Sequence, residues 1–179
     1  MNAEEAKGLI RNVPDFPIKG IQFKDITTAL ANPECLKWMR DEIVNHYKDL
    51  GITKIVGIES RGFILAPAVA IELGLGFVPI RKPGKLPAET VEVTYEKEYG
   101  RDTIQIHKDA LTPDDVVLIH DDILATGGSM DAAVDLVRKL GVRKIYINCI
   151  IELEGLHGRE YLEGDSEEIY CLFGLEVNE

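Results

Sequence analysis

The sequence is poor in cysteine and contains no long hydrophobic run. Its three cysteines, Cys35, Cys149 and Cys171, lie far apart and form neither a Cys-x-x-Cys motif nor a zinc spacing. We therefore expect reduced, buried thiols in a cytoplasmic protein. No apolar stretch approaches the length of a membrane span, and residues 1–5 lack the basic and apolar regions of a secretory signal. The four histidines are dispersed, which argues against a histidine metal site.

Basic residues are also in short supply. The sequence has 20 lysines and arginines but 31 acidic residues, and the formal net charge is −11. Such a charge argues against nucleic acid or an anionic membrane as the partner, and it makes any local basic cluster informative. With 179 residues, 45% of them hydrophobic, the chain is most simply one domain with a proper core.

Hydrophobic periodicity predicts strands that alternate with helices. Two stretches of alternating apolar and polar residues within 91–106 predict an exposed antiparallel ribbon. The rest of the pattern is typical of an α/β fold with a mainly parallel, doubly wound sheet flanked by helices. Strands are expected at 54–58, 76–80, 116–119, 144–152 and 169–173, and helices at 2–13, 33–50, 63–73, 130–140 and 154–162.

The stretch 116–140 reads as a strand, a loop and a helix. Residues 116–119 are apolar and mostly β-branched, which is typical of a strand buried on both faces of a parallel sheet. The later apolar residues recur at helical spacing, and Gly141 is a plausible helix stop. Ligands of open α/β sheets bind where such strands end, and here that position holds Asp121 and Asp122.

The loop that precedes the predicted helix suits a phosphate. Backbone N–H groups at a helix start are unpaired, and the helix dipole favours an anion there. Gly127 and Gly128 allow close approach, while the Thr126 and Ser129 hydroxyls can donate hydrogen bonds. The neighbouring acid pair would repel a phosphate, so the ligand must bring hydroxyls or a metal to it; a phosphorylated ribose does so. The glycine patterns of nucleoside triphosphatases and dinucleotide-binding folds are absent.

Residues 121–129 resemble the phosphoribosyl pyrophosphate (PRPP) signature of type I phosphoribosyltransferases. Nearly the whole chain is similar to the adenine-using members of that family. The resemblance implies that the acid pair holds the ribose 2′- and 3′-hydroxyls, and that Ala125 and the next four residues hold the 5′-phosphate. It also implies one domain over residues 1–179, with an N-terminal hood at 1–30 that recognises the base and a flexible β-ribbon lid at 81–103.

Two further segments are candidates for the pyrophosphate group. Ser60 and Arg61 follow the predicted strand 54–58, where N–H groups and a guanidinium can meet an anion. Arg81, Lys82 and Lys85 form a basic cluster, although most such runs are solvated turns. The resemblance implies that both segments bind pyrophosphate, and that one of these cations serves the neighbouring subunit of a homodimer.

The N-terminal segment carries the family's base-recognition motif. By resemblance, Phe23 stacks on adenine, while Ile21 and Lys24 present backbone groups to the edge of the base. Lys24 replaces the arginine of many members, and lysine lacks its planar fork. His120, before the acid pair, replaces a more usual apolar residue, and we expect no catalytic role for it. Glu59 stands where aspartate is common.

The lid segment contains the candidate acid–base residue. In the resembled family the Glu of a Glu-Tyr-Gly motif acts on the purine ring nitrogen; here that residue is Glu98, followed by the lid residue Tyr99. A carboxylate on a closing loop can be desolvated, which raises its pKa. Glu96 is the competing candidate.

These resemblances imply the reaction of adenine with PRPP to give AMP and pyrophosphate, a pentosyl transfer of purine salvage. Magnesium is expected, held mainly by PRPP, with no certain direct protein ligand. Two alternatives stay open. One is transfer to hypoxanthine, guanine, xanthine or a pyrimidine, which the N-terminal motif argues against. The other is a non-catalytic PRPP-sensing regulator of transcription, for which the chain shows neither a basic face nor a DNA-binding motif.

Overall fold

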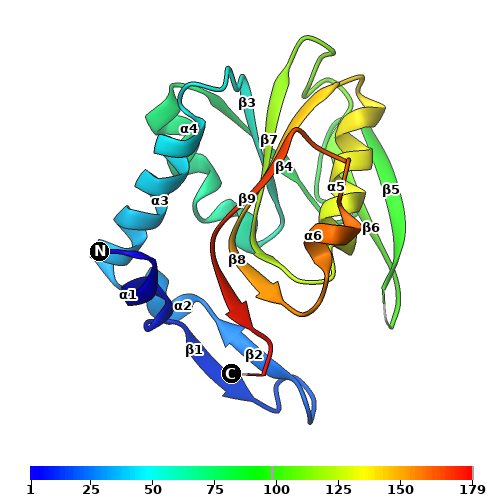
Figure 1. Ribbon diagram of the computed structural model, residues 1–179. Coiled ribbons are helices and arrows are strands. Elements are labelled where there is room, and N and C mark those ends of the chain that lie inside the picture. Colours follow the sequence, from blue (N-terminus) through cyan, green and yellow to red (C-terminus); the bar gives the residue numbers. More distant parts are fainter. Residues whose placement is uncertain (98, 179) are drawn as a thin grey trace.

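The computed structural model describes residues 1–97 and 99–178. At its centre is a five-stranded sheet in the order β4-β3-β7-β8-β9, and every neighbouring pair in it is parallel. Helices α3 and α4 lie on one side of the sheet and α5 lies on the other (Figure 1), so the predicted doubly wound α/β fold is confirmed. The elements are α1 (Ala3–Lys7), β1 (Arg11–Pro14), β2 (Gln22–Asp25), α2 (Thr27–Leu30), α3 (Pro33–Tyr47), β3 (Lys54–Ile58), a 3₁₀ turn (Arg61–Phe63), α4 (Ala66–Leu73), β4 (Gly76–Ile80), β5 (Thr90–Lys97), β6 (Gly100–His107), β7 (Val116–Leu124), α5 (Gly128–Lys139), β8 (Lys144–Glu154), α6 (Gly158–Tyr161) and β9 (Glu168–Glu176).

The strand order creates a crevice between β3 and β7. The chain passes from β3 outward to β4 and then returns to β7 on the other side of β3. The segments that follow β3 and β7 therefore leave the sheet toward opposite faces. Ligands of open α/β sheets bind at such a switch point, beyond the carboxyl ends of the strands.

Two antiparallel hairpins flank this end of the sheet. The hairpin β1–β2 lies beyond the arrowheads of β8 and β9, close to the C-terminus (Figure 1); it is part of segment 1–30, for which the name hood is kept below. The ribbon β5–β6 runs alongside α5, with its tip toward the same end. The predicted ribbon is therefore present, although its inner face is not exposed: Ile104 and Ile106 are buried in the core.

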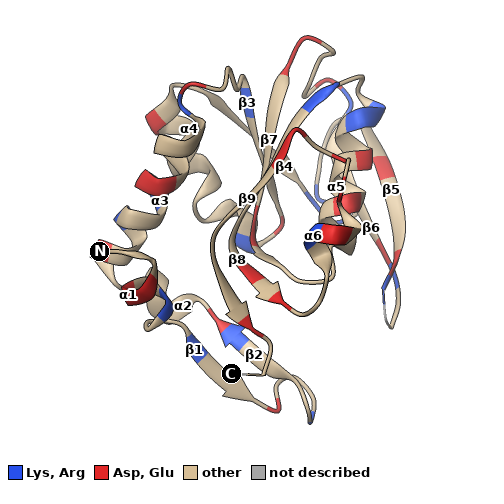
Figure 2. Cartoon of the chain, viewed as in Figure 1, with Lys and Arg blue, Asp and Glu red and all other residues tan. Residues whose placement is uncertain are grey.

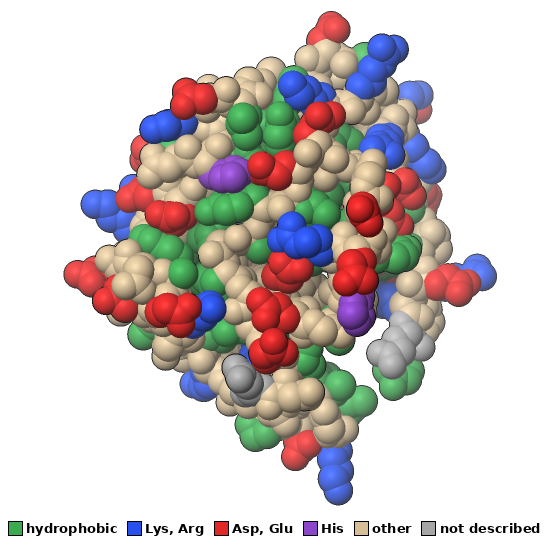
Figure 3. Space-filling model, viewed as in Figure 1, with side chains coloured by type: hydrophobic (Ala, Val, Ile, Leu, Met, Phe, Trp, Pro, Cys, Tyr) green, Lys and Arg blue, Asp and Glu red, His purple; other side chains and the backbone are tan. Residues whose placement is uncertain are grey.

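The surplus of acidic residues is spread over the molecule rather than gathered on one element. Acidic segments mark α1, α3, α4, α5 and β5 (Figure 2). On the face seen in Figure 3, acidic and basic side chains alternate with apolar ones. No helix of the described residues combines the length and apolar character needed to cross a membrane.

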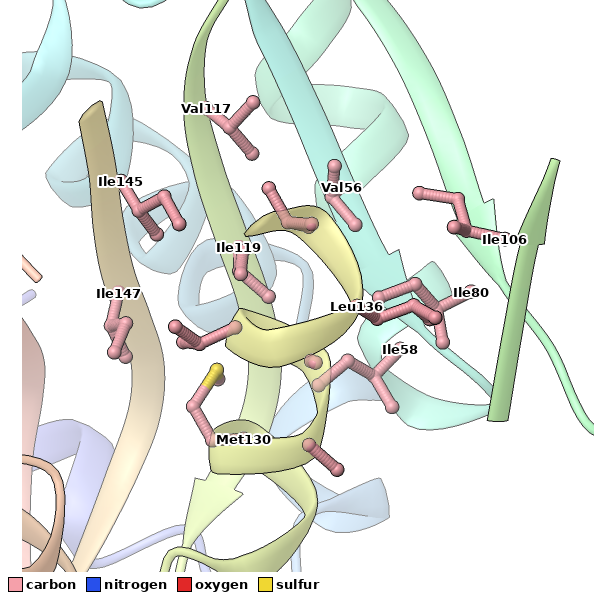
Figure 4. Packing of buried hydrophobic residues seen from close by; sticks show 14 of the residues in the cluster. Val56, Ile58, Ile80, Ile106, Val117, Ile119, Met130, Leu136, Ile145 and Ile147 are labelled. Atoms are coloured by element: carbon pink, nitrogen blue, oxygen red, sulfur yellow. The ribbon is translucent and has the colours of Figure 1, made fainter. Parts of the chain in front are cut away.

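The core between the sheet and α5 consists of interlocking aliphatic side chains. Met130 and Leu136 of α5 belong to one buried cluster with Ile119 of β7, and Figure 4 shows Leu136 on the side of Ile80 and Met130 on the side of Ile147. Branched side chains on strands buried on both faces are typical of a parallel sheet. This packing fixes α5, and with it the loop that precedes the helix.

Several local predictions are confirmed. The strands 54–58 and 76–80 have the expected bounds. Asn2 and Glu5 form the expected capping box, in which each side chain accepts a hydrogen bond from the other residue's backbone N–H. Gly141 follows the end of α5 with a positive φ of 88°, a conformation that glycine adopts without strain.

Other local predictions are wrong at element boundaries. The first helix ends at Lys7, and Val13 belongs to strand β1 because it pairs with Phe23 of β2. Leu36 is exposed rather than inward on α3, where Cys35 takes the buried position. Strand β7 continues to Leu124 because its pairing with β8 extends past the acid pair.

Candidate active site

A cavity of about 900 Å³ opens at the carboxyl end of the sheet, in the crevice between β3 and β7. Its walls come from the turn after β3, the end of β7 with the following loop, the β5–β6 ribbon and the connection between β8 and α6. Its lining residues are Ile58, Glu59, Ser60, Arg61, Lys82, Tyr95, Glu96, Lys97, Asp102, Ile104, Asp121, Asp122, Thr126, Gly128, Ser129 and Leu156.

The acid pair lies at the floor of this cavity. Asp122 is only 3% exposed, and its Oδ2 lies 2.9 Å from Nε of Arg61. Burial, followed by the charge of Asp122, raises the pKa of Asp121 well above its usual value. Two carboxylates that share a desolvated site disfavour each other's charge. Hydrogen bonds from hydroxyl groups, or a nearby cation, would stabilise their charged forms.

The loop after β7 leads through a glycine with positive φ into the start of α5. Gly127 has a φ of 92° and precedes α5, whose first residue is Gly128. Thr126 and Ser129 line the cavity beside these glycines. The first two residues of α5, Gly128 and Ser129, therefore lie at the cavity, and the N–H groups of a first helical turn have no partner within the helix.

The turn after β3 brings a cation to the acid pair. Arg61 forms the ion pair with Asp122, and its guanidinium lies 5.7 Å from the ring centroid of Phe23. Gly62 packs against β7 so closely that a Cβ would lie 2.8 Å from the carbonyl oxygen of His120. Both predicted residues of this turn, Ser60 and Arg61, line the cavity.

The basic cluster after β4 is divided by the fold. Lys82 lines the cavity. Arg81 instead directs its guanidinium to Glu59, with 2.8 Å between Nη2 and Oε1, and Lys85 is exposed outside the cavity lining. Glu59 also accepts the backbone N–H of Lys82, and although burial opposes it, these hydrogen bonds hold the pKa of Glu59 below its usual value. This carboxylate therefore fixes the start of the basic segment.

The predicted base-recognition residues lie on the hood, outside the cavity lining. Phe23 of β2 contacts Phe16 edge-on, at 5.1 Å between ring centroids, and lies beneath Arg61. Ile21 is 44% exposed, whereas Lys24 is buried. The hood thus meets the main site through the contact between Phe23 and Arg61.

Of the lid candidates, Glu98 lies outside the described residues. Glu96 lines the cavity, and Tyr99 is 80% exposed. His120 is fully buried on the sheet, where its Nδ1 lies 2.7 Å from Oδ1 of Asn148. Burial lowers the pKa of His120, which favours the neutral form of this core ring.

The cavity suits magnesium that arrives with a polyanion. Among the described residues, no three acidic, histidine or cysteine side chains gather as a metal cage. Asp121 and Asp122 nevertheless present oxygen atoms, the ligands that magnesium prefers. Acidic residues of the lining outnumber basic ones by five to three.

Sequence reasoning missed several residues that complete the site. Leu156 comes from the connection after β8, and Tyr95, Lys97 and Asp102 come from the ribbon. None of them lies in a local pattern that signals a ligand. They reach the cavity only because the ribbon and the β8–β9 connection fold toward it.

Comparison with known proteins agrees with this geometry. The family described as "Phosphoribosyl transferase domain" matches residues 26–172. The adenine phosphoribosyltransferase of Bacteroides fragilis is 59% identical over 167 residues, covering 93% of this chain and 94% of the relative. The enzyme of the same name from Phocaeicola vulgatus is 61% identical over 165 residues, covering 92% and 95%. The crystal structure of the Giardia lamblia enzyme complexed with 9-deazaadenine has a TM-score of 0.94 at 47% identity, covering 98% of both chains.

The fold and the cavity thus define a phosphoribosyltransferase, and the chain belongs to that family. Within it, the chain groups with the adenine phosphoribosyltransferases, to judge by the identity shared with both bacterial enzymes. The resemblance inferred from the sequence is confirmed, as is the type I phosphoribosyltransferase fold.

Proposed function

We propose that this chain transfers the 5-phosphoribosyl group of PRPP to adenine, giving AMP and pyrophosphate. The observation that carries the proposal is the position of the acid pair beside the glycine-rich helix start in one cavity. The helix start and the acid pair suit two different groups of one ligand. A helix start attracts a phosphate, and a carboxylate pair accepts hydrogen bonds from hydroxyl groups. The high identity to adenine phosphoribosyltransferases supports adenine as the acceptor.

The 5′-phosphate is assigned to residues 125–129 and the ribose hydroxyls to Asp121 and Asp122. This assignment is supported by the cavity lining, which includes both acids together with Thr126, Gly128 and Ser129. Fixing the sugar at both ends holds its C1 atom in one place. Positioning of this kind removes much of the entropic barrier to a displacement.

The pyrophosphate end is assigned to Ser60, Arg61, Arg81, Lys82 and Lys85. Three of them, Ser60, Arg61 and Lys82, line the same cavity as the acid pair. As the bond from C1 to pyrophosphate loosens, negative charge grows on the leaving group and positive charge grows on the sugar. Cations beside the leaving group and carboxylates near the sugar stabilise this separation of charge. Magnesium bound with the substrate would neutralise further charge on the leaving group.

Adenine is assigned to the hood, where Phe23 stacks on the ring and Ile21 and Lys24 present backbone groups to its edge. The contact of Phe23 with Arg61 supports this, because it brings the hood to the pyrophosphate side of the cavity. Glu98 is the proposed acid–base residue for the purine ring nitrogen, and the lid with Tyr99 excludes water that would hydrolyse PRPP.

The working form is proposed to be a homodimer in the cytoplasm. Ile64 and Ile71, beside and on α4, are 44% and 77% exposed, and such apolar side chains suit burial against a second copy. Lys85 is exposed outside its own cavity, which is compatible with service to the partner's site. All three cysteines are free thiols, as a reducing compartment favours.

One assay tests the activity. The chain is supplied with PRPP, magnesium and each nucleobase in turn, and nucleotide and pyrophosphate are measured. Product with adenine alone supports the proposal. Turnover only with guanine or hypoxanthine would identify a different purine enzyme, and PRPP binding without any product would identify a sensor.

A further inference from the structure

Three donors from the lid and the basic segment converge on one carboxylate oxygen inside the cavity. Lys97 Nζ lies 2.7 Å from Oδ2 of Asp102, Lys82 Nζ contacts the same atom, and the Tyr95 hydroxyl donates to it over 3.3 Å. The other oxygen accepts the N–H of Thr103. Lys82, Tyr95, Lys97 and Asp102 all line the cavity.

The electrostatics of this cluster keep Asp102 charged. Burial favours its neutral form, but the hydrogen bonds and charges of Lys82 and Lys97 outweigh burial and hold its pKa at about 2. The Asp102 side chain is 17% exposed, whereas those of Lys82 and Lys97 are 40% and 49% exposed. The acid is therefore the fixed member of the cluster, and the two ammonium groups remain accessible from the cavity.

Each cation that lines the cavity is paired with an acid of the same lining. Arg61 pairs with Asp122, and Lys82 and Lys97 share Asp102. A polyanion that enters must either leave these pairs intact or exchange partners with them. Lysine suits exchange, because its ammonium is a point charge on a flexible stem with three donors.

We propose that Lys97 is a further pyrophosphate-binding cation, and that Asp102 is a positioning residue that holds Lys97 and Lys82 until the polyanion takes them over. The proposal rests on the proposed function and deepens it at the pyrophosphate end. A diphosphate offers both lysines more charge and more acceptor oxygens than one carboxylate does, so the exchange favours the ligand. Asp102 competes with the ligand in this scheme and weakens its binding.

The first test compares Lys97→Gln with Lys108→Gln. Both variants lose one lysine charge, but Lys108 lies outside the cavity lining, where it pairs with Glu89 on the surface. Titration calorimetry with inorganic pyrophosphate and magnesium measures the dissociation constant. Lys97→Gln is expected to weaken binding by about 5-fold, and Lys108→Gln by less than about 1.5-fold. Equal values for the two variants would overturn the role of Lys97.

The second test compares Asp102→Asn with Asp109→Asn, an exposed acid in the turn after β6. Loss of the competing carboxylate is expected to tighten pyrophosphate binding by about 3-fold, whereas Asp109→Asn leaves it unchanged. A merely structural role for Asp102 predicts the opposite sign, because a disordered ribbon would bind less well. Weaker binding by Asp102→Asn, with an unchanged melting temperature, would refute the competition.

The double variant Lys97→Gln with Asp102→Asn completes the cycle. Once Asp102 no longer holds it, Lys97 is available to the ligand, so its removal is expected to cost more than the 5-fold of the single variant, about 10-fold. If the changes in binding free energy of the two single variants simply add in the double variant, the two residues act independently, and the proposed exchange is rejected. If the wild-type chain binds neither PRPP nor pyrophosphate, the proposed function fails as well; if it binds both and the variants match their controls, only this inference fails.

Discussion

Gly158 lies directly against Ala125, so that a Cβ at position 158 would come within 2.3 Å of the Ala125 carbonyl oxygen. The two residues belong to different connections of the sheet, one after β8 and one after β7. Tyr161 of α6 packs against the same loop, since a Cβ on Gly127 would lie 3.0 Å from the Tyr161 ring. The loop after β7, to which the 5′-phosphate is assigned by proposal, therefore packs directly against the start of α6.

Gly158→Ala should weaken this packing contact. The added methyl group forces the loop or α6 to move, which we expect to lower the free energy of unfolding by about 1–3 kcal/mol. PRPP affinity should fall by about 10-fold, because misplaced N–H groups no longer fit the phosphate. Gly76→Ala is the matched control, since its Cβ would meet only the Lys54 side chain at 3.8 Å. Equal melting temperatures and affinities for the two variants would show that the contact is unimportant.

The double variant Asp121→Asn with Asp122→Asn tests the ribose assignment. Replacing two charged acceptors by amides should weaken PRPP binding by about 10- to 100-fold. The melting temperature is measured as well, because Asp122→Asn also removes the carboxylate that pairs with Arg61. Calorimetric titration with PRPP and magnesium measures the loss, with the exposed Asp49→Asn as control. Wild-type affinity in the double variant would remove the acid pair from the ribose site.

Glu98→Gln should separate catalysis from binding. We expect turnover with adenine to fall by about 100-fold or more, while the PRPP dissociation constant changes by less than about 3-fold, because general acid–base catalysis acts in the transition state. Glu96→Gln, which alters the neighbouring lid acid, should have the smaller effect on turnover. Steady-state rates and PRPP titration are measured for both variants. A larger loss of turnover in Glu96→Gln would identify Glu96, not Glu98, as the acid–base residue.

Asp25 should give the hood a measurable pH dependence. Hydrogen bonds from the Thr27 hydroxyl and N–H, and then from Arg11, lower the pKa of Asp25 from 3.8 to about 2. A carboxyl group with a lowered folded-state pKa stabilises the fold above the unfolded value, and this contribution is lost as the pH falls from about 4 through 2. The melting temperatures of wild type and Asp25→Asn should therefore differ at pH 6 and converge toward pH 2. A constant difference over that range would contradict this assignment.

Local sequence patterns pointed to those parts of the cavity lining that are continuous in the chain. The segment 125–129 consists of the loop after β7 and the first two residues of α5, so one pattern of strand, glycine and helix predicts its geometry. Ser60 and Arg61 were found in the same way, since the turn follows β3 directly. Element boundaries were less predictable: β7 extends to Leu124 because its neighbour β8 offers hydrogen-bond partners that a single segment does not reveal.

The sequence by itself determined the alternation of strands and helices and the placing of the acid pair next to a glycine-rich helix start, because each depends on residues a few positions apart. Only the tertiary structure decided which distant groups meet. It directed Arg81 to Glu59, brought Lys82 and Lys97 to Asp102 and set Gly158 behind Ala125. These contacts depend on the strand order and on the way the ribbon closes over the sheet, and neither leaves a local pattern in the chain.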